Sequence, residues 1–243
     1  MDRIKNIDYC IQYLLKQDGI EADIPDTLSE KQLLLRALMN VWEPQPLSLE
    51  FIEAQDAELR AQLNDKGIVE NVGTLWQGDI TRLKVDAIVN AANSRGLGCW
   101  HPLHSCIDNA IHSAAGLQLR LACNDILQGR SINTSDAIIT QGYNLPAKWV
   151  IHTVGPIICQ AVPTHDEERQ LAECYRSCLR LAEEHGCRSI AFCCISTGEF
   201  HFPNRRAAEI AVEACRDTHL KKVVFNVFKD IDYDIYRQLL NKG

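Results

Sequence analysis

Several common sequence features are missing from this chain, and each absence excludes a class of protein. No apolar run approaches the roughly 18 residues that a transmembrane helix needs. The first residues mix both charges without an apolar stretch, which is not the pattern of an export signal. We therefore expect a cytoplasmic protein with no membrane association. Neither a Gly-x-Gly-x-x-Gly fingerprint nor a P-loop pattern is present, so the common dinucleotide and nucleoside-triphosphate sites lack sequence support.

Positive charge is also scarce. The 25 Lys and Arg residues are outnumbered by 32 Asp and Glu residues, which gives a formal net charge of −7. Proteins that bind nucleic acid directly usually carry a basic stripe, so we expect no direct nucleic-acid binding. Any phosphate that this protein binds must be held mainly by backbone N–H groups and helix N-termini.

The chain divides into two segments that differ in the pattern of their apolar residues. Residues 1–66 carry apolar residues at helical spacing and no strand-like run, which predicts a helical N-terminal extension. In residues 67–243, short β-branched runs alternate with helical stretches. This alternation predicts a three-layer α/β domain with a sheet covered on both faces. Within it we expect a strand at 69–76 and one long helix at 107–127.

Cysteine is abundant, with 11 residues. Two of these cysteines lie close in sequence to two histidines, and all four are possible metal ligands. Cys99, His101, His104 and Cys106 fall in one short loop-like segment. Thiolates and imidazoles are the usual ligands of Zn²⁺, and a helix beginning after Cys106 favours its thiolate form. A site with three protein ligands leaves one coordination position open, as in catalytic zinc sites. The alternative is a loop in which Cys and His are incidental.

The other cysteines and histidines are predicted to be structural. The odd number of cysteines and the missing export signal argue against a disulfide framework. Cys123 is isolated in sequence, and His112 and His152 each stand alone in a predicted element. Free cysteines of this kind are common in protein cores.

Three predicted strands end in residues suited to bind a sugar or a phosphate, and in open α/β sheets ligands bind beyond such strand ends. Residues 90–94 offer short amide side chains for sugar hydroxyls. Residues 195–200 contain a Ser-Thr-Gly turn that can bring backbone N–H groups close to a diphosphate. Residues 226–228 add an aromatic side chain. Taken singly, each pattern is also typical of an ordinary turn.

Taken in order, five motifs resemble those of the macrodomain family of ADP-ribose-binding proteins: Gly-Asp-Ile-Thr at 78–81, Asp-Ala-Ile-Val-Asn-Ala-Ala-Asn-Ser at 86–94, Asp-Asn-Ala-Ile-His-Ser-Ala-Ala-Gly at 108–116, Ile-His-Thr-Val-Gly-Pro at 151–156 and Ile-Ser-Thr-Gly at 195–198. The resemblance covers about residues 68–240. It implies a macrodomain-like α/β/α sandwich with a mixed central sheet. Most catalytic members carry a glycine run between the asparagine and aspartate motifs, where this chain has the longer segment 99–106.

That segment resembles the zinc-containing branch of microbial macrodomains, which also carries a helical N-terminal extension. The branch is often encoded beside a sirtuin-type ADP-ribosyltransferase, which the resemblance implies as a functional partner. It also implies that zinc is bound by Cys99, His104 and Cys106, with His101 the weaker candidate. The family often has glycine where this chain has His201.

Further site residues follow from the resemblance. Asp79 would bind the adenine amino group, supported by the backbone of Ile80, and Phe228 would pack near the adenine. Asn90 and Asn93 would contact the ligand, with Asn93 holding the distal ribose. The diphosphate loop would consist of Ser196, Thr197, Gly198, Glu199 and Phe200.

The implied reaction is the hydrolytic removal of mono-ADP-ribose from modified protein side chains, with zinc as cofactor. Asn93 would fix the ribose for attack by water, and Asp108 would orient that water or act as the base. Asp108 is predicted at the start of a helix, where the helix dipole favours its ionised form. The alternative is a reader module that binds ADP-ribose without cleaving it and holds a structural zinc.

Overall fold

The computed structural model describes residues 3–241, and it confirms the predicted α/β architecture with a mixed sheet. Within this range six strands pair in the order β1-β6-β5-β2-β4-β3. They are β1 (Leu75–Gln77), β2 (Ala87–Ala91), β3 (Ala137–Gln141), β4 (Trp149–Thr153), β5 (Ser189–Phe192) and β6 (Lys222–Val227). All neighbours are parallel except β3, which runs antiparallel to β4. Residues 1, 2, 242 and 243, at the outer ends of the two expected segments, lie outside the described residues.

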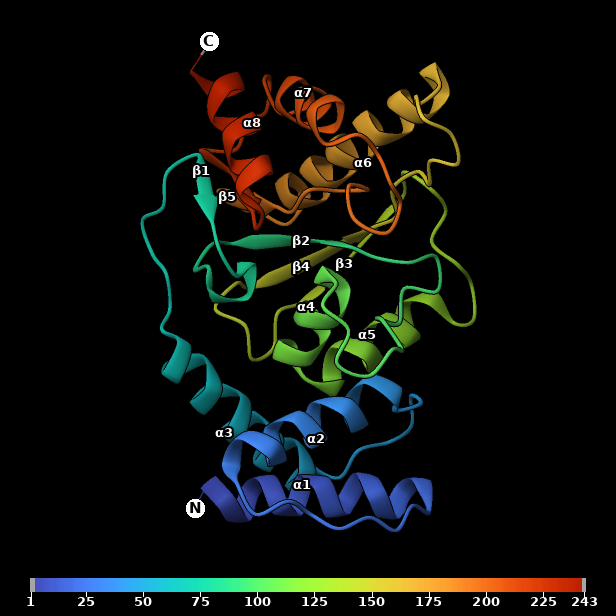
Figure 1. Cartoon of the computed structure of the whole chain (residues 1–243), viewed down its shortest axis with the longest axis vertical. Coiled ribbons are helices and arrows are strands. Elements are labelled where there is room, and N and C mark those ends of the chain that lie inside the picture. The colour runs from blue at the N-terminus through green and yellow to red at the C-terminus, as the bar shows by residue number, and fades with distance from the viewer. Residues whose placement is uncertain (1–2, 242–243) are drawn as a thin grey trace.

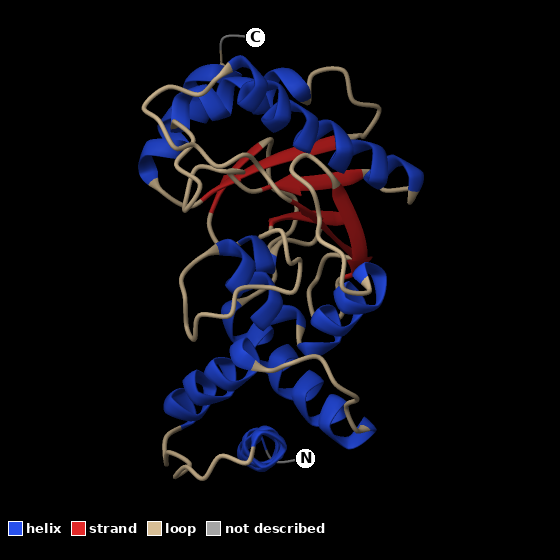
Figure 2. Cartoon of the chain, turned by 90° about the vertical axis from the view of Figure 1, so that its right-hand side faces the viewer, coloured by secondary structure: helices blue, strands red, loops and turns tan. Residues whose placement is uncertain are grey.

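Helices cover both faces of this sheet (Figures 1 and 2). One face carries α6 (His165–Glu184), α7 (Asn204–Ala214) and α8 (Asp230–Leu240), and the other carries α4 (Ile107–Ala115) and α5 (Leu117–Leu127). Residues 87–90 of the central strand β2 are fully buried, as expected for a strand covered on both sides. A short 3₁₀ turn, η1 (Ile80–Arg82), follows β1. No helix within residues 3–241 combines the length and apolar character that crossing a membrane requires.

Two predicted elements are wrong in detail. Of the strand expected at 69–76, only its end belongs to β1, and Val69 makes an isolated bridge to Leu83. Asn71 has a positive φ of 57°, which is incompatible with a continuous strand. The helix expected at 107–127 is two helices, because Gly116 has φ 100° and ends α4 before α5 begins.

The predicted helical extension is confirmed by α1 (Arg3–Asp18), α2 (Leu28–Val41) and α3 (Leu49–Lys66). Thr27 and Ser48 cap the N-termini of α2 and α3 by accepting backbone N–H groups. The three helices share an apolar cluster that includes the fully buried Trp42 and Phe51, and Leu117 at the start of α5 joins it. The extension thus packs below the α4–α5 layer, on the side away from the sheet (Figures 1 and 2).

Candidate active site

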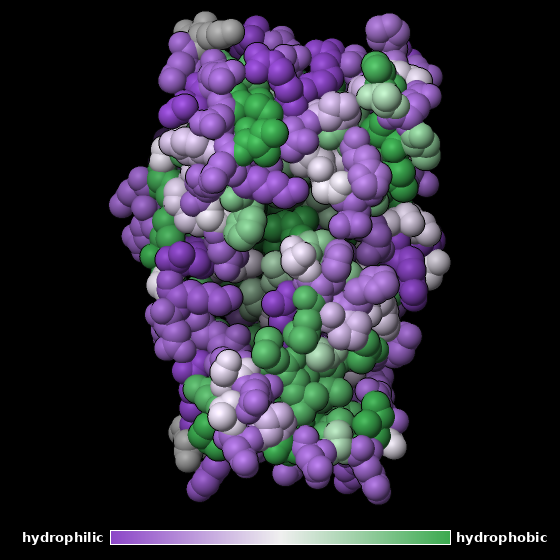
Figure 3. Space-filling model, in the orientation of Figure 1, coloured by the Kyte–Doolittle hydropathy of each residue, from purple (hydrophilic) through white to green (hydrophobic). Residues whose placement is uncertain are grey.

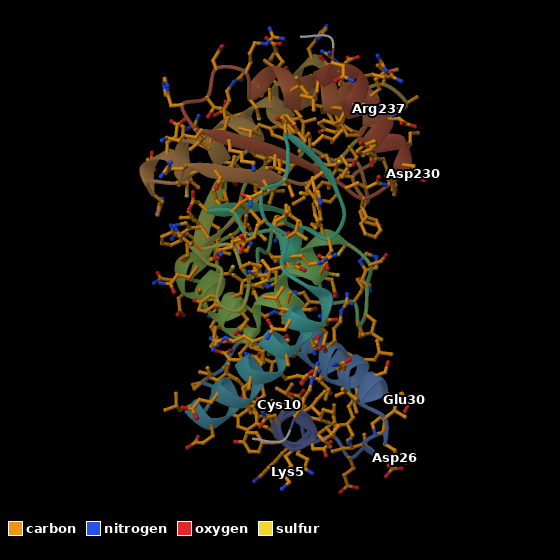
Figure 4. The ribbon with its side chains drawn as sticks, turned by 90° about the vertical axis from the view of Figure 1, so that its left-hand side faces the viewer. Lys5, Cys10, Asp26, Glu30, Asp230 and Arg237 are labelled. Carbon is orange, nitrogen blue, oxygen red and sulfur yellow. The ribbon has the colours of Figure 1, made fainter. Side chains whose placement is uncertain are left out.

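A cleft of about 1140 Å³ lies at the carboxyl ends of the parallel strands. Four predicted site segments line it: Asp79 and Ile80, Asn93, residues 99–108 in part, and Ser196–Phe200 with Phe228. Residues from the extension line it too, among them Ser29, Gln32 and Arg36 of α2 and Lys66 of α3. Figure 4 shows Glu30, near the start of α2, and Asp230, at the start of α8, projecting on the same side of the molecule. In the space-filling view, apolar surface is sunk between hydrophilic rims in the middle of the visible face (Figure 3).

Asp79 and Phe228 stand together at one end of this cleft. Asp79 follows β1 and caps η1, with Oδ1 accepting from the backbone N and the hydroxyl of Thr81 at 3.0 and 2.6 Å. Its second oxygen lies 3.7 Å from the Lys66 ammonium. Phe228 follows β6 and is 77% exposed, so its ring is free to pack on a planar ligand. Ile80 lines the cleft but is almost fully buried, so the predicted support of the ligand by its backbone stays a prediction.

The loop after β5, which is predicted to bind the diphosphate, begins with a residue in the left-handed region. Ser196 has φ 64° and is buried, and its Oγ has no hydrogen-bond partner among the described residues. Gly155 approaches it closely, because a Cβ at Gly155 would lie 2.0 Å from the Ser196 Oγ. His201 has φ 58°, in the left-handed region that glycine adopts without strain. This backbone explains why glycine suits the position that His201 occupies here.

Asp108 lies buried at the floor of the cleft, in the first turn of α4. Asn90 Nδ2 donates to its Oδ1 at 2.7 Å, and Asn93 Nδ2 donates to its Oδ2 at 3.1 Å. Two strand-end asparagines therefore hold both carboxylate oxygens. Asn93 lines the cleft, whereas the Asn90 side chain is fully buried beneath it. The Asn90 Nδ2 group is thus engaged with Asp108, and a contact between Asn90 and a sugar hydroxyl stays a prediction.

The ionisation of Asp108 is set by two opposing effects. Burial raises the pKa of Asp108 to about 6, against the hydrogen bonds from Asn90 and Asn93 and the charge of Arg120. At neutral pH the carboxyl is still mainly ionised, as its position at a helix start predicts. It is much closer to titrating than a carboxyl at an exposed helix start, because burial outweighs the hydrogen bonds and the Arg120 charge that lower its pKa.

Behind Asp108 lies a buried cluster that sequence reasoning missed. His112, Cys123 and His152 bring their ligand-type atoms within 4.8 Å of one another. His112 Nε2 lies 3.5 Å from Asp108 Oδ1, and neither ring nitrogen of His112 has a hydrogen-bond partner in the described part of the chain. Burial lowers the pKa of His152 to about 3 and that of His112 well below its usual range, so both rings are neutral. The three residues come from α4, α5 and β4, and only packing brings them together.

The structure brings Cys99, His104 and Cys106 together at the cleft wall. Their ligand atoms lie within 4.8 Å of one another, and Cys99 Sγ is 3.6 Å from His104 Nδ1. His101 is not part of the group. The set of two sulfurs and one imidazole fits Zn²⁺.

The pKa of the Cys106 thiol is set by its burial and by its neighbours. Burial raises the pKa of Cys106 to about 12, although the backbone N–H of Asn109 lowers it. The start of the helix favours the thiolate, as expected, but burial outweighs this effect. A divalent cation supplies the charge that deprotonates such a ligand.

Known proteins match this chain along its whole length. It is 48% identical to a protein-ADP-ribose hydrolase of Treponema medium, over 96% of this chain and 97% of that protein. It is 44% identical to a protein-ADP-ribose hydrolase of Staphylococcus aureus, over 100% of this chain and 99% of that protein.

A solved structure and a family model agree with these relatives. The Oceanobacillus iheyensis macrodomain with ADP superposes with a TM-score of 0.62 at 39% identity, over 69% of this chain and 89% of that one. The family model named Macro domain matches residues 89–211, which include β2, Asp108 and the loop after β5. With the fold, the full-length relatives and the family model in agreement, the chain belongs to the Macro domain family.

Proposed function

We propose that this protein is a zinc-dependent hydrolase that removes mono-ADP-ribose from modified protein side chains. The observation that carries the proposal is one shared cleft. A buried carboxylate held by asparagines, a Cys-His-Cys group and the turn predicted to bind the diphosphate all line it. The names of the full-length relatives support the same activity.

The ligand-binding residues each contact a different part of ADP-ribose. Phe228 packs on the adenine, and Asp79 Oδ2, which also faces the Lys66 ammonium, accepts from the adenine amino group. The turn at Ser196–Phe200 surrounds the diphosphate with backbone N–H groups, which a chain of net charge −7 needs in place of cationic side chains. Glu199, on this turn, lies 3.9 Å from His104, so the diphosphate turn and the metal-binding group are neighbours.

The distal ribose then lies beside Asn93 and Asp108. Asn93 donates to Asp108 and to the Gly98 carbonyl, so its amide is fixed in orientation and can fix the ribose in turn. Asp108 orients the attacking water and accepts its proton at a carboxylate oxygen. Cys99, His104 and Cys106 would hold zinc, which when bound would supply Lewis-acid polarisation at this end of the cleft.

The same proposal includes two partners, a mono-ADP-ribosylated protein as substrate and a sirtuin-type ADP-ribosyltransferase. It also places the protein in the cytoplasm. So does the division into a helical extension, residues 1–66, and a macrodomain, residues 67–243. The extension helices form an apolar cluster apart from the main core, joined from the macrodomain side by Leu117, and this supports that division.

The rival function is a reader that binds ADP-ribose without cleaving it. The test uses a mono-ADP-ribosylated protein and measures released ADP-ribose, with purified enzyme, with enzyme stripped by a chelator, and after zinc is added back. We expect release that chelation abolishes and zinc restores. Binding without release identifies a reader, and release that survives complete zinc removal contradicts the zinc dependence.

A further inference from the structure

Helix α2 of the extension reaches the metal-binding loop through Arg36. Its Nη2 donates to the backbone oxygen of His104 at 3.0 Å. Its Nε and Nη2 also donate to Asn109 Oδ1 at 3.1 and 2.7 Å. Asn109 is fully buried in α4, and its Nδ2 donates to the His101 carbonyl at 3.0 Å. One guanidinium thus joins the extension, the loop and the helix that carries Asp108.

Asn40, one helical turn after Arg36, makes a second connection. Its Oδ1 accepts from the backbone N of Leu103 at 3.0 Å, and its Nδ2 donates to Ser113 Oγ at 3.0 Å. Leu103 has φ 58°, a conformation that non-glycine residues adopt only where contacts hold it. The backbone immediately before His104 is therefore fixed by Asn40, and the backbone at His104 by Arg36.

The first half of the loop is tied to the end of the same helix. Arg120 lies over the Trp100 ring, 4.5 Å from its centroid, and Arg95 lies 5.0 Å from the same ring. The buried Arg120 guanidinium also donates to the carbonyls of Asn40 and Trp42 at 3.1 and 2.7 Å. Since these carbonyls end α2, Arg120 holds both the helix terminus and the loop.

We propose that α2 is part of the active site and that Arg36 is a positioning residue for His104, which rests on the zinc-dependent function proposed above. The loop 99–106 has no regular secondary structure, so its own backbone fixes little of its shape. Without outside contacts, metal binding must order the loop, and that ordering weakens affinity. Arg36 and Asn40 order it beforehand. The same helix lines the cleft through Ser29 and Gln32, so the extension shapes the site as well as supporting the loop.

The test compares wild type with Arg36→Met, which keeps an unbranched side chain of intermediate length and removes the donors. Zn²⁺ affinity is measured by competition with a chromophoric chelator, and the ligand field is read from the visible absorption of the Co²⁺-loaded protein. Amide hydrogen exchange of residues 99–106 is measured on metal-free protein. We expect affinity to fall by about 10-fold or more, the typical effect of losing an outer-shell partner. We also expect a shifted Co²⁺ band and faster exchange in the loop.

Two further variants separate positioning from general stability. Arg36→Lys keeps the charge but cannot span both acceptors, so it should restore affinity and spectrum only in part. Arg3→Met is the matched control, because Arg3 pairs with Glu58 and Asp65 and so holds α1 to α3, away from the loop. It should leave the metal affinity, the Co²⁺ spectrum and the exchange of residues 99–106 at wild-type values.

Each outcome decides one of the two proposals. Suppose that wild type takes up metal and that Arg36→Met has unchanged Zn²⁺ affinity, Co²⁺ spectrum and loop exchange. This result overturns the positioning role of Arg36 and leaves the zinc-dependent function standing. Equal changes in Arg3→Met and Arg36→Met also overturn it, since they reflect a loosened extension. If wild type takes up no metal, the zinc-dependent function fails, and exchange in Arg36→Met alone decides whether Arg36 orders the loop.

Discussion

Asn93 and Asp108 are joined across the floor of the cleft, with the asparagine amide 3.1 Å from a carboxylate oxygen. The same amide donates to the Gly98 carbonyl at 3.0 Å, so it has no freedom to turn away. This relationship couples the end of β2 to the first turn of α4. It gives the carboxylate a fixed direction in a place where burial raises its pKa to about 6.

The first prediction concerns that carboxylate. Asp108→Asn keeps the size of the side chain and removes its ability to accept a proton. We expect single-turnover release of ADP-ribose to fall by about 100-fold or more, as for loss of a general base. ADP-ribose affinity should stay within a few-fold, because the buried carboxylate acts mainly in the transition state.

Asp125→Asn, an exposed change in α5, is the control for Asp108→Asn and should turn over normally. Melting temperature and zinc content are measured on both variants. A folded, zinc-loaded Asp108→Asn protein with the wild-type single-turnover rate would leave Asp108 a structural role only.

The second prediction concerns the metal. Purified wild type should contain about one zinc per chain, and Cys99→Ser, His104→Ala and Cys106→Ser should each lose most of it, because three-ligand sites tolerate little loss. Elemental analysis gives the readout. Cys159→Ser, at an exposed cysteine outside the cluster, should retain its zinc. Full retention in all three ligand variants would refute the assignment.

The third prediction concerns the adenine. Asp79→Asn preserves an oxygen for the cap on Thr81 but replaces the other acceptor with an amide donor. Because hydrogen bonds to charged groups contribute about 1.5–3 kcal/mol, ADP-ribose affinity should fall by about 10- to 100-fold, with an unchanged melting temperature. Calorimetric titration measures it. Asp230→Asn, which removes a nearby charge that bonds Gln77, should bind normally. If Asp79→Asn bound ADP-ribose with wild-type affinity, the adenine would not bind at Asp79.

The fourth prediction concerns stability and pH. Burial by itself raises the pKa of Asp86, but hydrogen bonds from Lys148, Arg188 and Ser189 outweigh it and lower the pKa to about 2. A carboxyl with a lowered pKa stabilises the fold above its unfolded value, 3.8, and loses that contribution as pH falls toward 2.

Asp86→Asn should therefore lower the free energy of unfolding by about 1–2 kcal/mol at pH 7, less than the full shift because the side chain is partly exposed. The difference from wild type should shrink between pH 4 and 2. Denaturant unfolding of metal-free protein over this range measures it. A difference that stays constant down to pH 2 would show that the charge of Asp86 is not its source.

Local sequence determined much of this protein. The spacing of apolar residues predicted three-layer α/β packing and a helical extension, both confirmed. Cys99, His104 and Cys106 lie within eight residues, so a short loop suffices to bring them together. The motif after β5 predicted a turn, and Ser196 in this segment has a positive φ of 64°. The breaks at Asn71 and Gly116 were missed, because backbone conformation there departs from the apolar pattern.

Tertiary structure alone decided the environment of each site residue. Asn90 and Asn93 belong to one motif, yet packing buries the first beneath the cleft and leaves the second on its wall. Arg36 and Asn109 meet across 73 residues of sequence. Burial and long-range hydrogen bonds depend on where whole elements pack, and periodicity within one element does not encode that. For this reason the sequence predicted which side chains carry the chemistry, while only the fold set their ionisation, their orientation and the contribution of α2 to the site.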